Sequence, residues 1–325
     1  MKNNVLNIIK SINFIIRKGR KKLEKLSKED ITVINYLARY KIMLVEDTRY
    51  IYHSKWYYRK KIKRLIEDGY IKKYKFYYIE LDKKGRKMVG LTGKDYIKNK
   101  SNESYMERLK QISKIGTITI NSNIRFIPSW NMKEKDIYTD TARKYLGKMI
   151  TNQNTYLIYA ISDKKDKKYI HQLFYDINKI LDHKQIIIFV DSIEKLEDEY
   201  QYMSFKKEHT YIIINSKENR DVISKYKYID FYELVKKIMG EEKQILFSDW
   251  ELADYVFEKN LYILNMLFLD VEKINEIRWF YHENKNTKKT IKILTLKENE
   301  ETIKKLIPEN CEVVGINKSY LLKGG

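Results

Sequence analysis

Cationic side chains between residues 55 and 67 recur at a spacing that gathers them on one side of a helix. On a helical wheel, Tyr58, Ile62, Leu65 and Ile66 share one face, which is expected to pack inward. The side chains on or beside the opposite face are Trp56, Arg59, Lys60, Lys63 and Arg64. Guanidinium and ammonium groups presented in this way can reach phosphates and guanine edges in the major groove of DNA. The spacing therefore predicts a DNA-contacting helix; the simpler alternative is a solvated basic helix in a lysine-rich protein.

Further cations follow this helix in a segment with strand character. Aromatic and β-branched runs at residues 70–74 and 76–81 predict a small two-stranded hairpin. Lysines in and beside the first run would extend the DNA-contacting surface. The complete set of expected DNA contacts is Lys55, Trp56, Tyr57, Arg59, Lys60, Lys63, Arg64, Lys72, Lys73 and Lys75.

Residues that could form a cofactor or metal site are sparse. The five histidines are scattered and form no His-x-His pair, and the single cysteine, Cys311, excludes both a disulfide framework and a multi-cysteine metal site. The chain also lacks the phosphate-binding loop G-x-x-x-x-G-K-[ST], the dinucleotide motif G-x-G-x-x-G and the nucleophile elbow G-x-S-x-G. We therefore expect neither a cofactor nor a bound metal.

One sequence pattern is compatible with metal-dependent cleavage of DNA. Nucleases of the restriction-endonuclease type place an acid on one strand and Asp/Glu-x-Lys at the end of a neighbouring strand, where the carboxylates hold Mg²⁺. Two Asp-x-Lys matches follow residues 156–161, and they give the candidate catalytic residues Asp163, Asp166 and Lys168. Lysine is so frequent in this chain that such matches are common, and residues 127–129 lack the partner acid. We favour an exposed loop and a non-enzymatic role, with Mg²⁺-dependent nicking of DNA as the enzymatic alternative.

The charge is distributed unevenly along the chain. The net charge of the 325 residues is +21. Residues 1–100 contain 28 Lys and Arg against 10 Asp and Glu, a net of +18, whereas the remainder contains 37 against 34, a net of +3. An AT-rich genome would enrich lysine throughout the chain, so it does not explain this asymmetry. The distribution therefore places a binding site for a polyanion in the N-terminal third.

Signals for helix boundaries organise the segment around the basic helix. Ser27 and Asp30 fit a capping box, and apolar residues from Ile31 to Tyr40 follow at helical spacing. A shorter helix fits residues 45–52, Ser54 can cap the basic helix, and Gly69 can end it. Together with the hairpin, these elements predict a winged helix-turn-helix over residues 27–91.

The segment before this domain is amphipathic and basic. Residues 1–26 contain an apolar helical stripe followed by the basic run 17–22. Secretory signals have the reverse order, with basic residues before the apolar core. We expect this segment to pack on the winged helix or on a second copy, giving a homodimer; a helix lying on a membrane surface is the alternative.

The remaining two thirds of the chain alternate between strand and helix patterns. Polar residues 92–104 predict a linker, and residues 105–325 predict an α/β domain. This domain would begin with a hairpin over residues 118–127 and a helix over residues 141–149. Continuous apolar runs at residues 155–161, 185–191 and 210–215, separated by helical patterns, predict a mostly parallel sheet covered on both faces. Residues 249–283 mix the helical and the strand period, so no secondary structure is predicted for them.

The segment from Leu26 to Gly90 resembles the replication-relaxation family of plasmid and mobile-element proteins. The resemblance rests on a Leu-Ser-Lys-Glu-Asp start, a Tyr-Leu-Ala-Arg-Tyr helix and Leu-Ile-Glu-Asp-Gly-Tyr-Ile before the hairpin. It implies a sequence-specific binder of double-stranded DNA in replication initiation or DNA processing, with host replication proteins as further partners. A ligand-responsive transcriptional regulator and a metal-dependent nuclease or relaxase are the alternatives. The single cysteine and the lack of a long apolar run lead us to expect a cytoplasmic protein without a membrane span.

Overall fold

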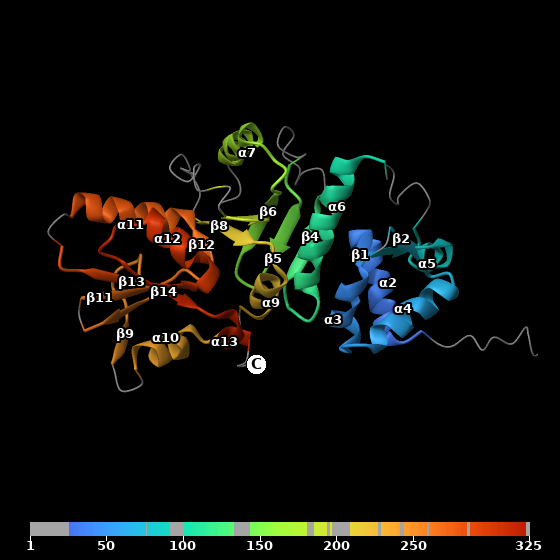
Figure 1. The fold of residues 1–325 in the computed structure, drawn as a ribbon, viewed down its shortest axis with the longest axis horizontal. Coiled ribbons are helices and arrows are strands. Elements are labelled where there is room, and N and C mark those ends of the chain that lie inside the picture. Colours follow the sequence, from blue (N-terminus) through green and yellow to red (C-terminus); the bar gives the residue numbers. More distant parts are fainter. Residues whose placement is uncertain are drawn as a thin grey trace, which may run out of the picture. The chain divides into compact units, whose positions relative to one another are not determined.

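The computed structural model describes residues 26–322, apart from residue 76 and the segments 92–100, 133–143, 181–184, 194–195, 197–208, 227–228, 241–243, 259 and 285–286. The chain divides into two compact units, Met1–Tyr96 and Ile97–Gly325, here termed the N-terminal and C-terminal units (Figure 1). The division falls inside the predicted linker 92–104. The helix predicted over residues 1–26 lies, apart from Leu26, outside the described residues.

The described part of the N-terminal unit combines four α-helices and a 3-10 turn with one small sheet. Its elements are α2 (Lys28–Tyr40), β1 (Ile42–Leu44), the 3-10 turn η1 (Val45–Thr48), α3 (Arg49–Tyr52), α4 (Tyr57–Glu67), β2 (Ile71–Tyr74), β3 (Tyr78–Leu81) and α5 (Lys83–Met88). The sheet has the order β1-β3-β2, and both pairings are antiparallel. The strand β1 and the helix α5 were not predicted, because each is too short to show a period of its own.

The predicted boundary signals of this unit are present. The Ser27 hydroxyl accepts a hydrogen bond from the backbone N–H of Asp30, and the Asp30 carboxylate accepts one from the N–H of Ser27, so the predicted capping box starts α2. Gly69 has a φ of +75°, a left-handed conformation that glycine adopts without strain. Residues Val33, Ile34, Tyr36, Leu37 and Tyr40 of α2 are buried. Ile31, expected among them, is exposed because on a helical wheel it lies on the side of α2 away from that face.

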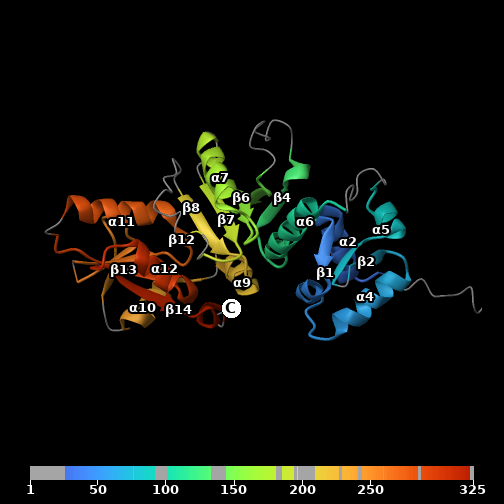
Figure 2. The ribbon, with the colours of Figure 1, turned by 45° about the horizontal axis from the view of Figure 1, so that its top comes forward.

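The first sheet of the C-terminal unit has six strands in the order β12-β8-β7-β6-β5-β4. Its strands are β4 (Arg125–Pro128), β5 (Gly147–Ile150), β6 (Thr155–Ile161), β7 (Gln185–Val190), β8 (His209–Ile214) and β12 (Leu269–Asp270). Only the pairings of β7 with β6 and β8 are parallel. The helices and turns that belong with it are α6 (Glu103–Gly116), η2 (Thr117–Thr119), η3 (Ser129–Asn131), α7 (Lys167–Lys179) and α9 (Lys217–Lys225). Figure 2 shows α6 alongside β4 at one edge of the sheet, and α11 (Val271–Glu283) follows β12 at the other edge.

The second sheet of this unit has five strands in the order β14-β13-β11-β10-β9. Its strands are β9 (Ile245–Phe247), β10 (Tyr255–Phe257), β11 (Leu261–Asn265), β13 (Thr290–Leu296) and β14 (Glu312–Ile316). The accompanying helices and turn are α10 (Phe231–Met239), α11 (Val271–Glu283), η7 (Lys297–Asn299), α12 (Glu300–Leu306) and α13 (Lys318–Leu322). One hydrophobic cluster contains residues of both sheets and of α11, so the C-terminal unit has a shared core.

Three predictions for this unit were wrong. Residues 117–119 form a 3-10 turn rather than a strand, and β4 pairs with β5, so the hairpin over residues 118–127 does not exist. Residues 147–150 are strand β5, not the end of a helix. The mostly parallel sheet is instead two mixed sheets. In the first, antiparallel pairings lie on both sides of the parallel centre. In the second, β14, β13 and β11 pair in parallel, whereas β11, β10 and β9 pair antiparallel. Short apolar runs fit helix and strand equally well, and only the partner strand distinguishes them.

The described helices also bear on the membrane prediction. None of those that the structure describes combines the length with the apolar character that a bilayer crossing requires.

Candidate nucleic-acid interface

The helix α4 has one buried and one exposed face, as its spacing predicts. Tyr58, Ile62 and Leu65 are buried in the core of the N-terminal unit. The side chains that face solvent are Trp56, Tyr57, Arg59, Lys60 and Lys63. The sequence thus folds α4 so that its aliphatic residues hold the helix in place and its cations and first aromatic residues remain accessible.

The start of α4 is fixed by the turn that separates it from α3. His53 adopts a left-handed conformation with a φ of 48°, which ends α3. The Ser54 hydroxyl then accepts a hydrogen bond of 2.9 Å from the backbone N–H of Tyr57. This hydroxyl satisfies a free N–H of the first turn. The N-cap position itself is Trp56, whose side chain makes no cap hydrogen bond, so Ser54 lies two residues before the N-cap position predicted for it.

A buried carboxylate determines how α4 is held against the other helices. Asp30 of α2 is fully buried and accepts a hydrogen bond of 2.8 Å from the Tyr52 hydroxyl of α3. The same carboxylate forms an ion pair with the Arg64 guanidinium of α4. Burial and the bond to Asp30 raise the pKa of the Tyr52 hydroxyl, which therefore remains a donor. The three side chains connect α2, α3 and α4, and we term them the Asp30 anchor.

Arg64 consequently has a different place from the one predicted. Its side chain is only 24% exposed and its guanidinium is directed to Asp30 rather than outward with Lys60 and Lys63. No feature of the sequence could have revealed this, because the two residues are 34 positions apart and the pairing depends on how the helices pack. We therefore assign Arg64 to the anchor and leave it out of the candidate interface.

The exposed cations of α4 lie beside aromatic rings rather than acids. The Lys55 ammonium is 6.0 Å and the Arg59 guanidinium 5.8 Å from the centre of the Trp56 ring. Among the residues that the structure describes, Arg59 and Lys60 form no ion pair with an acid. Lys63 is 3.9 Å from Glu67, a solvent-exposed pair of small energetic value. The charge of this face is thus available to a polyanion.

The predicted hairpin is formed by β2 and β3, and its lysines differ in their surroundings. Lys72 is 3.5 Å from the buried Glu80, so its charge is partly compensated. Lys73 and Lys75 are exposed near the tip, where Lys75 has a φ of 50°. Tyr77, 71% exposed, adds an aromatic ring to the same tip. Its carbonyl accepts a hydrogen bond of 2.8 Å from Val45, which attaches the hairpin to η1.

The two aspartates among the candidate catalytic residues of the C-terminal unit form local structural hydrogen bonds. Asp166 caps α7 and accepts a hydrogen bond of 2.7 Å from the N–H of Tyr169. Asp163 accepts one of 3.1 Å from the Ser192 hydroxyl, and Lys168 is exposed on α7. The strand β5 next to β6 carries no acid. The described residues contain no group of three or more His, Cys, Asp or Glu side chains that could hold a metal ion.

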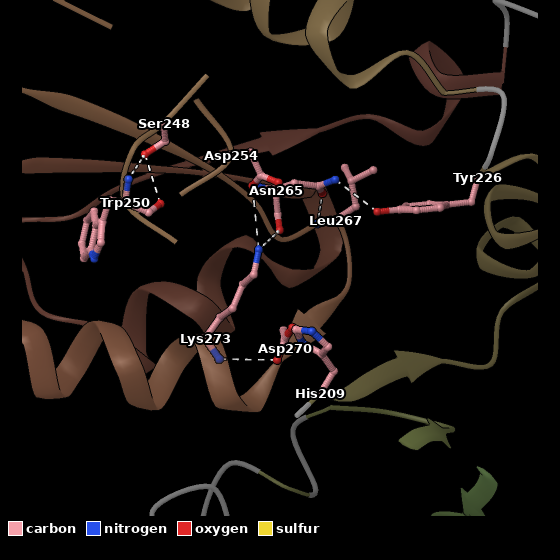
Figure 3. A network of polar contacts seen from close by, with 9 residues as sticks. All are labelled: His209, Tyr226, Ser248, Trp250, Asp254, Asn265, Leu267, Asp270 and Lys273. Atoms are coloured by element: carbon pink, nitrogen blue, oxygen red, sulfur yellow. Dashed lines mark hydrogen bonds and ion pairs between the residues drawn. The ribbon is translucent and has the colours of Figure 1, made fainter. Parts of the chain in front are cut away.

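A larger polar network of the C-terminal unit joins its two sheets (Figure 3). The Nδ1 atom of His209, at the start of β8, is 3.1 Å from the carboxylate of Asp270, which also caps α11. The Lys273 ammonium, one turn further along α11, is 3.8 Å from the Asp254 carboxylate and donates to the carbonyl of Asn265 on β11. The remaining members drawn in the figure are Tyr226, Ser248, Trp250 and Leu267. These contacts connect β8 and β12 to β11, so we interpret the network as structural.

Titratable groups of this network have shifted pKa values. The hydrogen bond to Asp270 raises the pKa of His209. Burial raises the pKa of the adjacent Glu272 to about 7, and the negative charge of Asp270 adds to this effect. The Glu272 carboxylate accepts a hydrogen bond from the backbone N–H of Thr210. Sequence analysis did not single out these residues, because their proximity arises only when β8 pairs with β12.

Comparison with known proteins adds no assignment to this geometry. Neither the protein-family models, nor the curated proteins, nor the solved structures compared with this chain gave a match.

Proposed function

We propose that the N-terminal unit is a winged helix-turn-helix that binds double-stranded DNA. In this proposal α3 and α4 form the helix-turn-helix, α4 enters the major groove, and the β2–β3 hairpin lies against the backbone as the wing. The observation that carries it is the exposed face of α4, where Arg59 and Lys60 have no acidic partner among the described residues, opposite a buried aliphatic face. The order of helices and strands in this unit supports the same interpretation.

The charge of the chain supports a nucleic acid over other partners. A net charge of +18 within residues 1–100 matches the regular negative charge of a DNA backbone. Exposed lysines on both α4 and the hairpin give two separate sets of phosphate contacts, which would fix the orientation of the unit on a duplex. Base edges would then be read by the side chains at the start of α4.

The resemblance to the replication-relaxation family suggests the biological setting. We propose a DNA-binding protein of a plasmid or mobile element that acts in replication initiation or DNA processing, as a homodimer. The C-terminal unit would serve self-association or the recruitment of host replication proteins. A repeated target site would fit this role, because each copy of a dimer reads one half-site.

The test measures binding of the full chain to random-sequence duplex DNA by fluorescence anisotropy. The variant Arg59→Ala/Lys60→Ala/Lys63→Ala should bind roughly 10- to 100-fold more weakly than the wild type, because three exposed cations of α4 are removed. A matched control removes three exposed lysines from the C-terminal unit: Lys168→Ala/Lys179→Ala/Lys237→Ala. The control should bind within about threefold of the wild type. Equal loss in both variants, or no duplex binding by the wild type, would overturn the proposal.

A further inference from the structure

The two aromatic residues at the start of α4 are unusually exposed for their size. Trp56 is 68% and Tyr57 52% exposed, whereas Tyr58, the next residue, is buried. An isolated exposed aromatic residue needs no explanation, since folded proteins leave much apolar area in water. Here, however, two are adjacent and lie among the exposed cations of the candidate interface. Their position therefore suggests that a partner covers them.

Hydrogen bonds define the backbone on both sides of Trp56, and two cations lie near its ring. The Ser54 hydroxyl accepts a hydrogen bond from the N–H of Tyr57, and the Trp56 carbonyl accepts one of 3.3 Å from the N–H of Arg59. The cations of Lys55 and Arg59 both lie within 6.0 Å of the ring centre. A side chain on a backbone fixed in this way loses less conformational freedom on binding than one in a flexible segment. Trp56 is thus suited to a defined contact rather than a diffuse one.

The major groove offers few groups that an indole ring can contact favourably. Each base edge presents hydrogen-bond donors and acceptors, and the thymine 5-methyl is the apolar group among them. The first residues of a recognition helix are those that contact base edges. Trp56 precedes the first residue of α4 and supplies a large apolar surface with a single N–H donor. Its best-matched partner in the groove is therefore thymine.

We propose that Trp56 is a specificity-determining residue that packs on the 5-methyl group of thymine, so that the ligand of the N-terminal unit is an A·T-containing duplex. This inference rests on the proposed function, because it requires α4 in the major groove. In that geometry Arg59, Lys60 and Lys63 contact the phosphates of the DNA backbone. Trp56 distinguishes thymine from the other bases. Removal of Trp56 should then reduce discrimination more than affinity.

The test compares two duplexes that differ only by the methyl group, alternating d(AT) and alternating d(AU). The wild-type full chain should bind d(AT) about fourfold more tightly than d(AU) for each methyl buried. Trp56→Ala should lower the affinity for d(AT) to the level of d(AU) and leave d(AU) binding nearly unchanged. Trp279→Ala is the matched control, since Trp279 on α11 is 67% exposed and should leave the preference for d(AT) intact.

A second measurement reports contact directly. Binding of d(AT) should shift the tryptophan emission of the wild type and of Trp279→Phe, and the shift should be absent in Trp56→Phe. If the wild type binds neither duplex, the proposed function itself is wrong. If it binds both equally and Trp56→Ala behaves in the same way, only the role of Trp56 is wrong. A stronger interaction with single-stranded oligo(dT) than with either duplex would also overturn the proposal, because it would indicate base stacking.

Discussion

The buried carboxylate of Asp30 affects the candidate interface although it does not itself reach the surface. It is fully buried, it accepts hydrogen bonds from Ser27 and Tyr52, and it pairs with Arg64. Buried ion pairs are weak contributors to net stability, but the loss of one partner leaves the other charge without compensation. The Asp30 anchor therefore fixes the orientation of α4 and so the direction in which its exposed cations point.

Asp30→Asn should destabilise the N-terminal unit by about 3 kcal/mol, because Arg64 loses its anionic partner. Hydrogen exchange followed by mass spectrometry would show this as faster exchange of the α4 amides. Glu67→Gln, an exposed change on the same helix, is the control and should have no such effect. Adding Arg64→Met to Asp30→Asn should recover part of the loss; a double variant as unstable as the sum of the single variants would contradict the pairing.

Glu272 gives the C-terminal unit a dependence on pH. Its pKa in the folded chain is about 7, above the usual carboxyl value, and the pKa of His209 is also raised. At pH values between the unfolded and the folded pKa of each group, the folded state therefore binds more protons than the unfolded state. The stability contributed by both groups is fully present below their unfolded pKa values and is lost as the pH rises through their folded ones.

Stability of this unit should therefore fall as the pH rises from about 5 to 8. Glu272→Gln should flatten this dependence and raise the stability at the alkaline end by an amount on the order of 1–3 kcal/mol, since the neutral amide is already in the favoured charge state. The melting temperature as a function of pH would measure the effect. Glu283→Gln, an exposed change on the same helix, should retain the wild-type profile. A profile unaltered by Glu272→Gln would contradict the assignment.

The turn between α3 and α4 shows how a short element can control a surface. His53 in the left-handed conformation ends one helix, and the Ser54 hydroxyl accepts a hydrogen bond from the N–H of Tyr57, the first residue of the next helix. Ser54→Ala should cost about 1 kcal/mol in the N-terminal unit, because a free N–H of the first turn loses its acceptor. The exchange rates of the amide hydrogens in the first turn of α4 would measure the effect. Asn35→Ala, at an exposed position of α2, is the control; equal effects at both positions would show that the cap is not the cause.

Elements with a clear period and explicit boundary residues were predictable from the sequence. The capping box at Ser27, the two faces of α4 and strands β6, β7 and β8 all follow from local patterns. Local patterns do not determine strand partners, and for this reason β5 was taken for a helix and the two mixed sheets for one parallel sheet. The exposure of the α4 cations was predictable from the helical spacing. Arg64 is the exception, because the carboxylate of Asp30, distant in the sequence, determines the direction of its side chain.

Most of the net charge and the larger hydrophobic core lie in different units of the chain. The C-terminal unit carries the larger hydrophobic cluster, which spans both sheets, whereas nearly all the net charge lies within residues 1–100. Such a division is expected when one part of a protein binds a polyanion and the other serves a different purpose. If the proposed function is correct, the ionic strength of the solution should affect the proposed DNA binding strongly and the folding of the C-terminal unit little.

The dependence of DNA affinity on salt tests this division quantitatively. Each phosphate neutralised by a cation releases condensed counterions, and the logarithm of the affinity falls with the logarithm of the salt concentration by about 0.9 per phosphate. Arg59, Lys60 and Lys63 on α4, with Lys73 and Lys75 on the hairpin, predict a slope of about −4 to −5. Removal of the three α4 cations should reduce its magnitude by about 3, whereas Trp56→Ala should leave it unchanged because an indole carries no charge. Anisotropy titrations between about 50 and 200 mM salt would measure both slopes. A slope that stays the same without the α4 cations would mean that other residues contact the phosphates, and α4 would then have to be placed away from the groove.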